Sequence, residues 1–313
     1  AQARLRSADA SRASDLRALT ADVKAQYYEL LRAKERLALA QDLQSAAETF
    51  DVLTRKGVEL GARPAVDATQ SAMEVTRARQ QVTLAAAEAD RARASLNILM
   101  GRDVDTPIDS LEALPASFSP IDPSIATTLS RSDIAASEAT ADALRQDARL
   151  ARAEGKPDIA LQYRATSVTR GWRDSGFGVA ITLPLLDYGD RRGRIRQSEE
   201  AAKAQDDRTR ALTAQAQLEV RQAVSRVQSA DKILADYAGL TAQAQSLLDA
   251  SRIGYEEGKT GVGEYLTAQR TFRAVRADEI DARIAAALAR AELERASGAF
   301  PVATPKETEK TNE

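Results

Sequence analysis

Neither histidine nor cysteine occurs anywhere in this 313-residue sequence. Their absence excludes imidazole catalysis, thiol chemistry and metal sites built on His or Cys side chains. Aromatic residues make up only 4% of the chain, so it cannot build a bulky globular core, although helices can still pack along narrow seams of small residues. No apolar run reaches the roughly 18–20 residues that a transmembrane helix requires.

Charge of neither sign is in excess: Lys+Arg number 44, Asp+Glu number 46, and the formal net charge is -2. This balance suggests neither nucleic acid nor an acidic surface as a partner, and it suits long solvated helices with ion pairs four residues apart. Paired carboxylates for acid–base catalysis, a glycine-rich phosphate loop after a strand, and a nucleophile with its base are also missing. We therefore expect a protein that is not an enzyme and that uses no cofactor and no metal.

The sequence contains an internal repeat: the pattern of one helical hairpin occurs twice, 197 positions apart and without a gap. Leucine and valine recur every seven residues in the first copy, which predicts a coiled-coil-like helix over about 3–56 with a length of roughly 80 Å. A second helix of each copy is expected to end near Met100 and Ser297. The matched pairs are Val23 and Val220, Leu30 and Val227, Leu37 and Leu234, Gly57 and Gly254, Gly61 and Gly258, Leu96 and Leu293, and Gly101 and Gly298.

Each copy is interrupted by a glycine-rich turn, over Gly57–Pro64 in the first and Gly254–Gly263 in the second. Glycines that supply positive φ are expected to stop the long helices there, and a proline suits the start of the next helix. These residues reverse the chain, and the turns are also the far ends of long hairpins, where a pore could close or a partner could dock. Tyr255 and the neighbouring charged groups, including Lys259, are expected to be open to contact. The candidate tip residues are Gly57, Gly61, Pro64, Asp67, Tyr255, Glu256, Glu257, Gly258, Gly261 and Glu264.

One stretch between the two copies changes from helical to period-two spacing, which predicts a β-hairpin. Two strands of about ten residues have the length of membrane-spanning strands, with one face toward lipid and the other toward a lumen. An ordinary amphipathic hairpin packed on a soluble core is the alternative. A lone hairpin is marginally stable, however, and nothing else predicts a sheet, so the strands favour a barrel shared between subunits. The large apolar strand residues are Ile159, Leu161, Tyr163, Phe177, Val179, Ile181, Leu183 and Leu185.

A basic cluster follows the second strand. It either forms a solvated first turn of the next helix or marks the membrane–water boundary, and the sequence leaves both interpretations open. The cluster consists of Arg191, Arg192, Arg194 and Arg196.

The resulting fold class is mainly α, with two tandem long helical hairpins and a membrane β-hairpin. Proline-rich segments and composition set the expected divisions. These are a first helical hairpin at 1–101, a linker at 102–130, a short helix at 131–157, the β-hairpin at 158–187, a second helical hairpin at 188–300, and a disordered tail at 301–313.

Several motifs at these positions resemble the TolC family of outer-membrane efflux and export channels. Arg131–Ile134 opens the short helix and Pro157–Leu161 opens the first strand. Gly178–Asp187 with Tyr188 and Gly189 closes the second strand, and Tyr255–Gly258 followed by Glu264–Arg270 marks the second hairpin. The resemblance covers about residues 3–300, and its most specific parts are the strand-to-helix motif and the second turn.

The resemblance implies a homotrimer in the outer membrane of a Gram-negative bacterium. Its strands would form one shared barrel in outer-membrane lipid, and its helices would continue as a periplasmic tunnel. The tips, mapped to Gly57–Asp67 and Gly254–Glu264, would form a gate and meet a periplasmic adaptor protein joined to an inner-membrane pump. The implied function is a passive, gated conduit of a tripartite efflux or type I secretion system. The alternative is a soluble periplasmic coiled-coil scaffold or adaptor that binds partners through its hairpin tips.

The sequence departs from the family pattern at its start. The family's first hairpin is also preceded by a short helix and a strand pair, whereas this sequence begins with Ala1 inside a helical pattern. Three chains would then supply six strands instead of the twelve that the family needs. We therefore expect the sequence to be a fragment that lacks the N-terminal part of the subunit.

Overall fold

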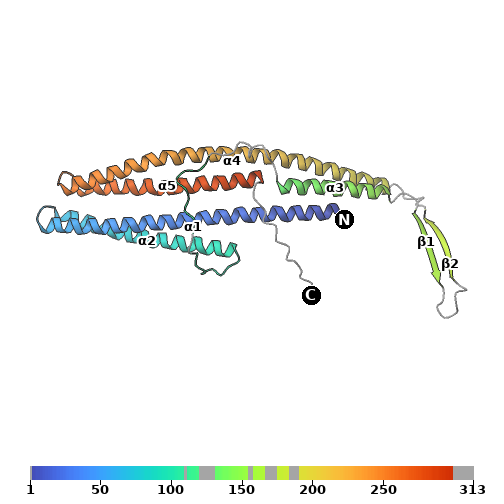
Figure 1. Cartoon of the computed structure of the whole chain (residues 1–313), viewed down its shortest axis with the longest axis horizontal. Helices are drawn as coiled ribbons and strands as arrows, with labels where there is room; N and C mark the ends of the chain where they lie inside the picture. Colours follow the sequence, from blue (N-terminus) through green and yellow to red (C-terminus); the bar gives the residue numbers. More distant parts are fainter. Residues whose placement is uncertain are drawn as a thin grey trace. The chain divides into compact units, whose positions relative to one another are not determined.

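The structure, a computed structural model, describes residues 2–108, 111–119, 131–153, 158–165, 175–182 and 190–298. Its helices and strands follow the order expected from the sequence (Figure 1). They are α1 (Gln2–Glu59), α2 (Ala65–Leu99), α3 (Ser132–Ala153), β1 (Asp158–Ala165), β2 (Ser175–Thr182), α4 (Asp190–Glu256) and α5 (Val262–Ser297). None of the described helices is both long enough and apolar enough to span a membrane.

The internal repeat is visible in the helix boundaries. The first turn lies between Glu59 and Ala65, and the second lies between Glu256 and Val262, which are the same positions displaced by 197. α1 therefore corresponds to α4, and α2 corresponds to α5.

The chain divides into two compact units, one formed by residues 16–130 and 217–313 and the other by residues 1–15 and 131–216. Each unit combines parts of both repeats. The successive divisions of the chain expected from the sequence stay a prediction.

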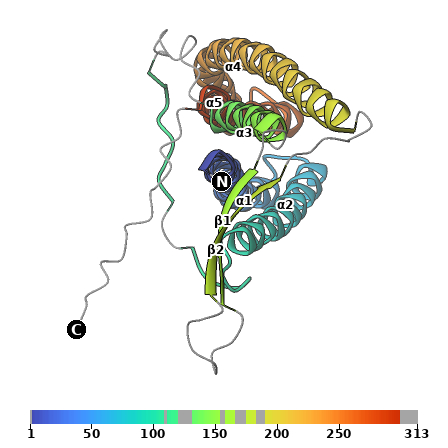
Figure 2. The ribbon, with the colours of Figure 1, turned by 90° about the vertical axis from the view of Figure 1, so that its right-hand side faces the viewer.

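The larger unit is a layer in which α4, α5, α1 and α2 follow one another in the view of Figure 1, and α2 also packs directly against α5 near the turns (Figure 2 shows the same ribbon turned by 90°). Asp51 of α1 accepts a 2.6 Å hydrogen bond from Ser71 of α2. α1 and α5 are joined by the ion pairs Arg36–Asp281 and Glu35–Arg283. Asp231 of α4 pairs with Arg290 of α5 at 2.7 Å. Polar contacts therefore join α1 to α2, α1 to α5, and α4 to α5.

The core of this layer is a set of narrow seams rich in alanine, as the low aromatic content predicts. Leu30 and Val227 of the heptad pattern are fully buried, whereas Leu16 remains 37% exposed. Val220 and Val227 pack with Leu293 and Ala296 between α4 and α5. Small side chains let the helix axes approach, and the few large ones fix the register.

A linker segment after α2 runs across this layer and contacts both hairpins. Lys34 donates to the Ile108 carbonyl at 2.7 Å, and the Glu112 amide donates to the Tyr27 hydroxyl at 2.7 Å. Further along, Phe118 packs beside Leu234, with the Arg290 guanidinium 4.2 Å from its ring centre. The linker expected to be irregular is thus held to both repeats where the structure describes it.

The smaller unit joins the start of α1 to α3 and the first half of α4. Ser7 and Thr140 hydroxyls lie 2.9 Å apart, and Ser137 and Thr209 hydroxyls lie 2.7 Å apart. At the start of α3, Arg131 binds Asp133, and this hydrogen bond lowers the pKa of the Asp133 carboxyl. The Arg131–Ile134 motif therefore stabilises the first turn of α3.

Strands β1 and β2 form an antiparallel two-stranded sheet. Their register places Ile159 opposite Ile181, Leu161 opposite Val179, and Tyr163 opposite Phe177. All of these side chains therefore share one face of the sheet, as the period-two pattern predicts. Ala160, Gln162, Gly178 and Ala180 occupy the other face.

Some expectations need correction, and others lie outside the described residues. The long helices do not stop at Gly57 and Gly254: both glycines lie inside helices that continue to Glu59 and Glu256. Leu183 and Leu185, the tail at 301–313 and the Arg191 side chain lie outside what the structure describes.

The α4–α5 seam yields a stability prediction. Leu293→Ala should lower the free energy of unfolding by about 2–4 kcal/mol, because Leu293 is buried against two valines. Leu53→Ala, at a 41% exposed position, should cost less than about 1 kcal/mol. Urea unfolding followed by circular dichroism at 222 nm measures both. Equal losses would show that the buried seam does not carry the stability.

Candidate functional site

The two hairpin turns have the same backbone structure. Gly61 and Gly258 adopt φ of 68° and 76°, which L side chains rarely adopt. The Ala62 amide donates to the Gly57 carbonyl at 2.9 Å, and the equivalent Lys259 amide donates to the Gly254 carbonyl at 2.8 Å. The repeated glycines therefore encode one turn used twice.

Gly57 and Gly254 have a different role from the one expected. A Cβ atom at Gly57 would lie 2.8 Å from Cγ of Arg63, and one at Gly254 would lie 3.0 Å from the Thr260 side chain. Arg63 and Thr260 are themselves equivalent positions of the repeat. These glycines therefore make room for the chain that returns over the helix end, rather than ending the helix.

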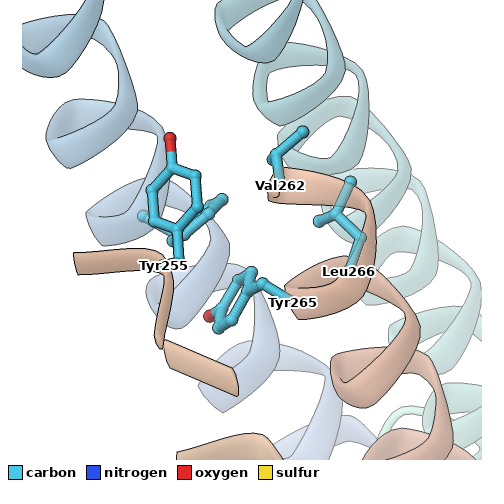
Figure 3. Close-up of a cluster of buried hydrophobic side chains, with 5 residues drawn as sticks. Tyr255, Val262, Tyr265 and Leu266 are labelled. Carbon is cyan, nitrogen blue, oxygen red and sulfur yellow. The ribbon is translucent and has the colours of Figure 1, made fainter. Parts of the chain in front are cut away.

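The tips of the two hairpins meet in an aromatic cluster. Phe50 of α1 stacks on Tyr265 of α5 with ring centroids 3.9 Å apart, and it also contacts Tyr255 of α4 at 4.9 Å. Figure 3 shows Tyr255, Tyr265, Val262 and Leu266 converging beside α1. Burial raises the pKa of the Tyr265 hydroxyl. Both repeats therefore contribute to one core at this end of the layer.

Polar contacts join the same two tips. The Arg63 guanidinium, from the first turn, lies over the Tyr255 ring at 4.1 Å and donates a hydrogen bond to the Tyr255 carbonyl oxygen. The Tyr255 hydroxyl donates to the Thr54 hydroxyl at 3.2 Å. Tyr255 is only 2% exposed, so the expectation that it is open to contact is wrong. It is instead the residue through which the second tip is held by the first.

The expected carboxylates divide into buried and exposed groups. Asp67 in the first turn of α2 is buried, whereas Glu256, Glu257 and Glu264 are exposed on the second tip. Lys259 pairs with Glu257 at 2.5 Å. The second tip therefore presents an acidic surface.

The first tip presents a different, mostly apolar surface. Leu60 is 74% exposed and Val66 is 55% exposed, and Gly61 and Pro64 are exposed between them. Sequence reasoning identified the glycines and charged residues of the tips but missed Phe50, Thr54, Arg63 and Tyr265. The one available signal in the sequence was Arg63, which directly precedes Pro64 in the first turn.

A second buried carboxylate lies further from the tips, between α2 and α5. Glu74 is 5% exposed, and guanidinium nitrogens of Arg77, Arg270 and Arg273 lie 3.5–3.9 Å from its oxygens. Because two of these arginines belong to α5, the first and second repeats are joined electrostatically here as well.

The β-hairpin is the other unusual surface. Its six large apolar side chains in β1 and β2 are between 52% and 80% exposed. Tyr163 and Phe177 contact each other across the strands, with ring centroids 5.0 Å apart. A two-stranded sheet with one fully apolar face open to solvent is not stable in water on its own.

A family model for outer membrane efflux proteins matches residues 126–299. The chain belongs to the outer membrane efflux protein family. The matched region includes the β-hairpin and the whole second repeat, and the TolC-like fold expected from the motifs is confirmed.

Similar proteins agree with this assignment. The cobalt-zinc-cadmium resistance protein CzcC of Cupriavidus metallidurans is 28% identical over 270 residues, covering 80% of this chain and 62% of CzcC. This chain therefore spans less than two thirds of that relative. The outer-membrane channel OprN matches with a TM-score of 0.80 and 22% identity over 95% of this chain and 69% of OprN. The outer membrane protein VceC of Vibrio cholerae matches with a TM-score of 0.78 and 18% identity over 95% of this chain and 74% of VceC.

The positive φ at the turns gives a test with a matched control. Gly258→Ala should destabilise the second tip by about 1–2 kcal/mol, because an L side chain is strained at a φ of 76°. Gly263→Ala, in the first turn of α5 with open space around it, should be neutral or stabilising by up to about 1 kcal/mol. Hydrogen exchange of amides in 251–266 reads the local stability. Equal protection in both variants would contradict the role given to Gly258.

Proposed function

We propose that this protein is the outer-membrane subunit of a tripartite efflux or type I secretion system and acts as a passive conduit from the periplasm to the exterior. The observation that carries the proposal is the exposed apolar face of the β-hairpin, formed by three cross-strand pairs in register. Lipid would cover this face, and strands from further subunits would satisfy the free strand edges. The opposite face, with Ala160, Gln162, Gly178 and Ala180, is small or polar enough to line a lumen.

The proposed assembly is a homotrimer in which the helical layers continue the barrel as a periplasmic tunnel. The tips would then be its inner-membrane end, where the tunnel closes. In this proposal Arg63 and Tyr255 hold neighbouring tips together in the closed state. Opening would require these contacts to separate.

A periplasmic adaptor protein, joined to an inner-membrane pump, is the proposed partner at the tips. The exposed apolar residues Leu60 and Val66 of the first tip and the carboxylates Glu256 and Glu257 of the second support this. Such a surface suits a partner that offers an apolar side chain next to basic groups. No step of this function needs bond making or breaking.

The substrate would be chosen mainly by the pump. With no His, no Cys and only two Met, this sequence holds too few soft ligands to form a cluster that would retain a transition metal. A metal ion, a drug or a polypeptide could therefore pass without a dedicated site. The alternative function, a soluble periplasmic scaffold, predicts that the protein stays monodisperse without detergent.

Membrane insertion can be tested by placing a charge on either face of one strand. Val179→Arg should reduce outer-membrane insertion, because an arginine facing lipid costs about 2–4 kcal/mol near the bilayer midplane. Ala180→Arg, on the opposite face, should insert nearly as well as wild type. Protease protection of the hairpin in outer-membrane fractions compares them. If both variants insert equally, the apolar face does not meet lipid and the scaffold alternative gains support.

Gating can be tested at Arg63 in planar bilayers. Loss of a cation–π contact and a charge-assisted hydrogen bond should weaken the closed state by about 1–2 kcal/mol, so Arg63→Gln should raise the open fraction roughly tenfold. Arg55→Gln is the control, because Arg55 is near the same tip but pairs only with Asp51 of its own helix.

Two results would contradict this account. If membrane-inserted wild-type trimers conduct no ions, the conduit function fails. If Arg63→Gln and Arg55→Gln conduct alike, the channel remains but the role given to Arg63 is wrong.

A further inference from the structure

The buried carboxylate of Glu74, between α2 and α5, is surrounded by more positive charge than it can balance. Arg77 of α2 and Arg270 and Arg273 of α5 all have guanidinium nitrogens within 3.9 Å of its oxygens. These N···O distances of 3.5–3.9 Å are longer than those of ordinary hydrogen bonds, and Oε2 of Glu74 is buried without a hydrogen-bond partner. One negative charge therefore faces three positive charges, which leaves a local excess of two.

The N–H groups of these three arginines are free to bind something else. Each guanidinium carries five donors in a planar fork, an arrangement that binds a carboxylate through two parallel hydrogen bonds. Among the described residues, none accepts a hydrogen bond from any of the three, whereas Arg290 of the same layer donates two hydrogen bonds to Asp231. Their side chains are 40–52% exposed, so a molecule from solution can reach them.

A cavity of about 210 Å³ lies beside this cluster, between α1, α2 and α5. Arg270, Arg273 and Glu74 form part of its wall. A cavity of about 150 Å³ is large enough to hold benzene, so this one has room for a six-membered ring and a carboxylate. The apolar part of its wall consists of Leu39 and Leu43 of α1 with Ala78, Leu84 and Ala85 of α2.

The other charges of the wall do not cancel the positive excess. Arg36 is paired with Asp281 and adds no net charge. Glu88 is exposed and lies roughly 21 Å along α2 from Glu74, so solvent and ions screen its charge at the cluster. The two remaining polar residues of the wall are glutamines. The cavity is therefore positive beside the arginines and apolar along α1 and α2.

We propose that this cavity is a binding site for a small amphipathic carboxylate, that is, one carboxylate on a compact apolar body. The carboxylate accepts hydrogen bonds from Arg270 and Arg273, and the apolar body lies against the leucines and alanines of α1 and α2. An inorganic anion would leave the apolar wall uncovered, and an uncharged ring would leave the guanidiniums unpaired. Because its wall comes from both repeats, the bound ligand also joins them. Such a site goes beyond the proposed function, which needs no fixed ligand.

Fluorine NMR can measure the binding with 4-fluorobenzoate, which combines a carboxylate with a single ring. In an uncharged maltoside detergent it should bind with a Kd on the order of 1 mM, as expected for a ligand of about ten heavy atoms. The matched compound 4-fluorobenzyl alcohol has the same ring without the charge, and it should bind at least about fivefold more weakly. Equal affinity for the two compounds would show that the arginines do not bind the ligand, and would overturn the proposal.

Charge variants with opposite expected effects test where the carboxylate binds. Arg270→Gln and Arg273→Gln should each weaken 4-fluorobenzoate binding about fivefold or more, because each removes a charge and its donors. Glu74→Gln should strengthen binding several-fold, because it removes the carboxylate that competes for the same guanidiniums. Arg79→Gln is the control and should bind like the wild type, because Arg79 lies on the same part of α2 but pairs with Glu48.

Filling the cavity tests its apolar part without a change of charge. Ala85→Leu adds three carbon atoms to the wall and should weaken 4-fluorobenzoate binding about fivefold or more, because the ring and the new side chain compete for the same space. Ala87→Leu adds the same atoms at an exposed position of α2 outside the wall, and it should bind like the wild type.

Circular dichroism at 222 nm checks that each variant is helical, and stronger binding by Glu74→Gln cannot come from unfolding. Weaker binding in the arginine and Ala85 variants together with stronger binding in Glu74→Gln would assign the ligand to this cavity. Binding that none of these variants changes would lie elsewhere on the protein or in the detergent, and would overturn the proposal, as would the absence of binding to the wild type. None of these results bears on conduction, so a negative outcome leaves the proposed channel intact.

Discussion

The packing of α1 against α5 is the contact on which the rest of the helical layer depends. It joins the first repeat to the second through ion pairs such as Lys24–Glu294 and Glu35–Arg283, and the α2–α5 contact at Glu74 joins the same two repeats nearer the turns. Alanine brings the helices close but leaves their register poorly defined, since alanines at adjacent turns are interchangeable. Charged pairs at fixed positions remove that ambiguity. The register set here determines that both turns reach the same end and that Arg63 meets Tyr255.

The two repeats have diverged where they meet at the tips. Phe50, Thr54 and Arg63 come from the first repeat, and their counterparts in the second are Leu247, Ser251 and Thr260. Conversely, Tyr255 and Tyr265 of the second repeat correspond to Val58 and Ala68 of the first. The aromatic cluster is therefore built from residues that differ between the two repeats. Duplication supplied the shared turn, and divergence made the first tip apolar and basic and the second acidic and aromatic.

Periodicity and turn chemistry made most of the architecture predictable from the sequence. The heptads of α1 and α4, the alternation in Phe177–Ile181 and the repeated glycines each report local geometry, so elements and their order follow. The contacts of the tips depend on residues about 200 positions apart, and no local pattern reports that Tyr255 lies between Thr54 and Arg63. Gly57 shows the same limit. Glycine favours a helix end in sequence statistics, but here it makes room for Arg63, which is a tertiary effect.

The β-hairpin and the helical layer are stabilised in different ways. The β-hairpin has an apolar face and free backbone edges, so an apolar environment and further strands would satisfy it. The helical layer has satisfied backbones, and side chains alone join its helices. The ion pairs between α1 and α5 and the Arg63–Tyr255 contact are directional, so they hold the two hairpins of the chain in one position. Separation of the two tips would break these contacts between the hairpins, whereas the alanine-rich seam between α4 and α5 could stay intact.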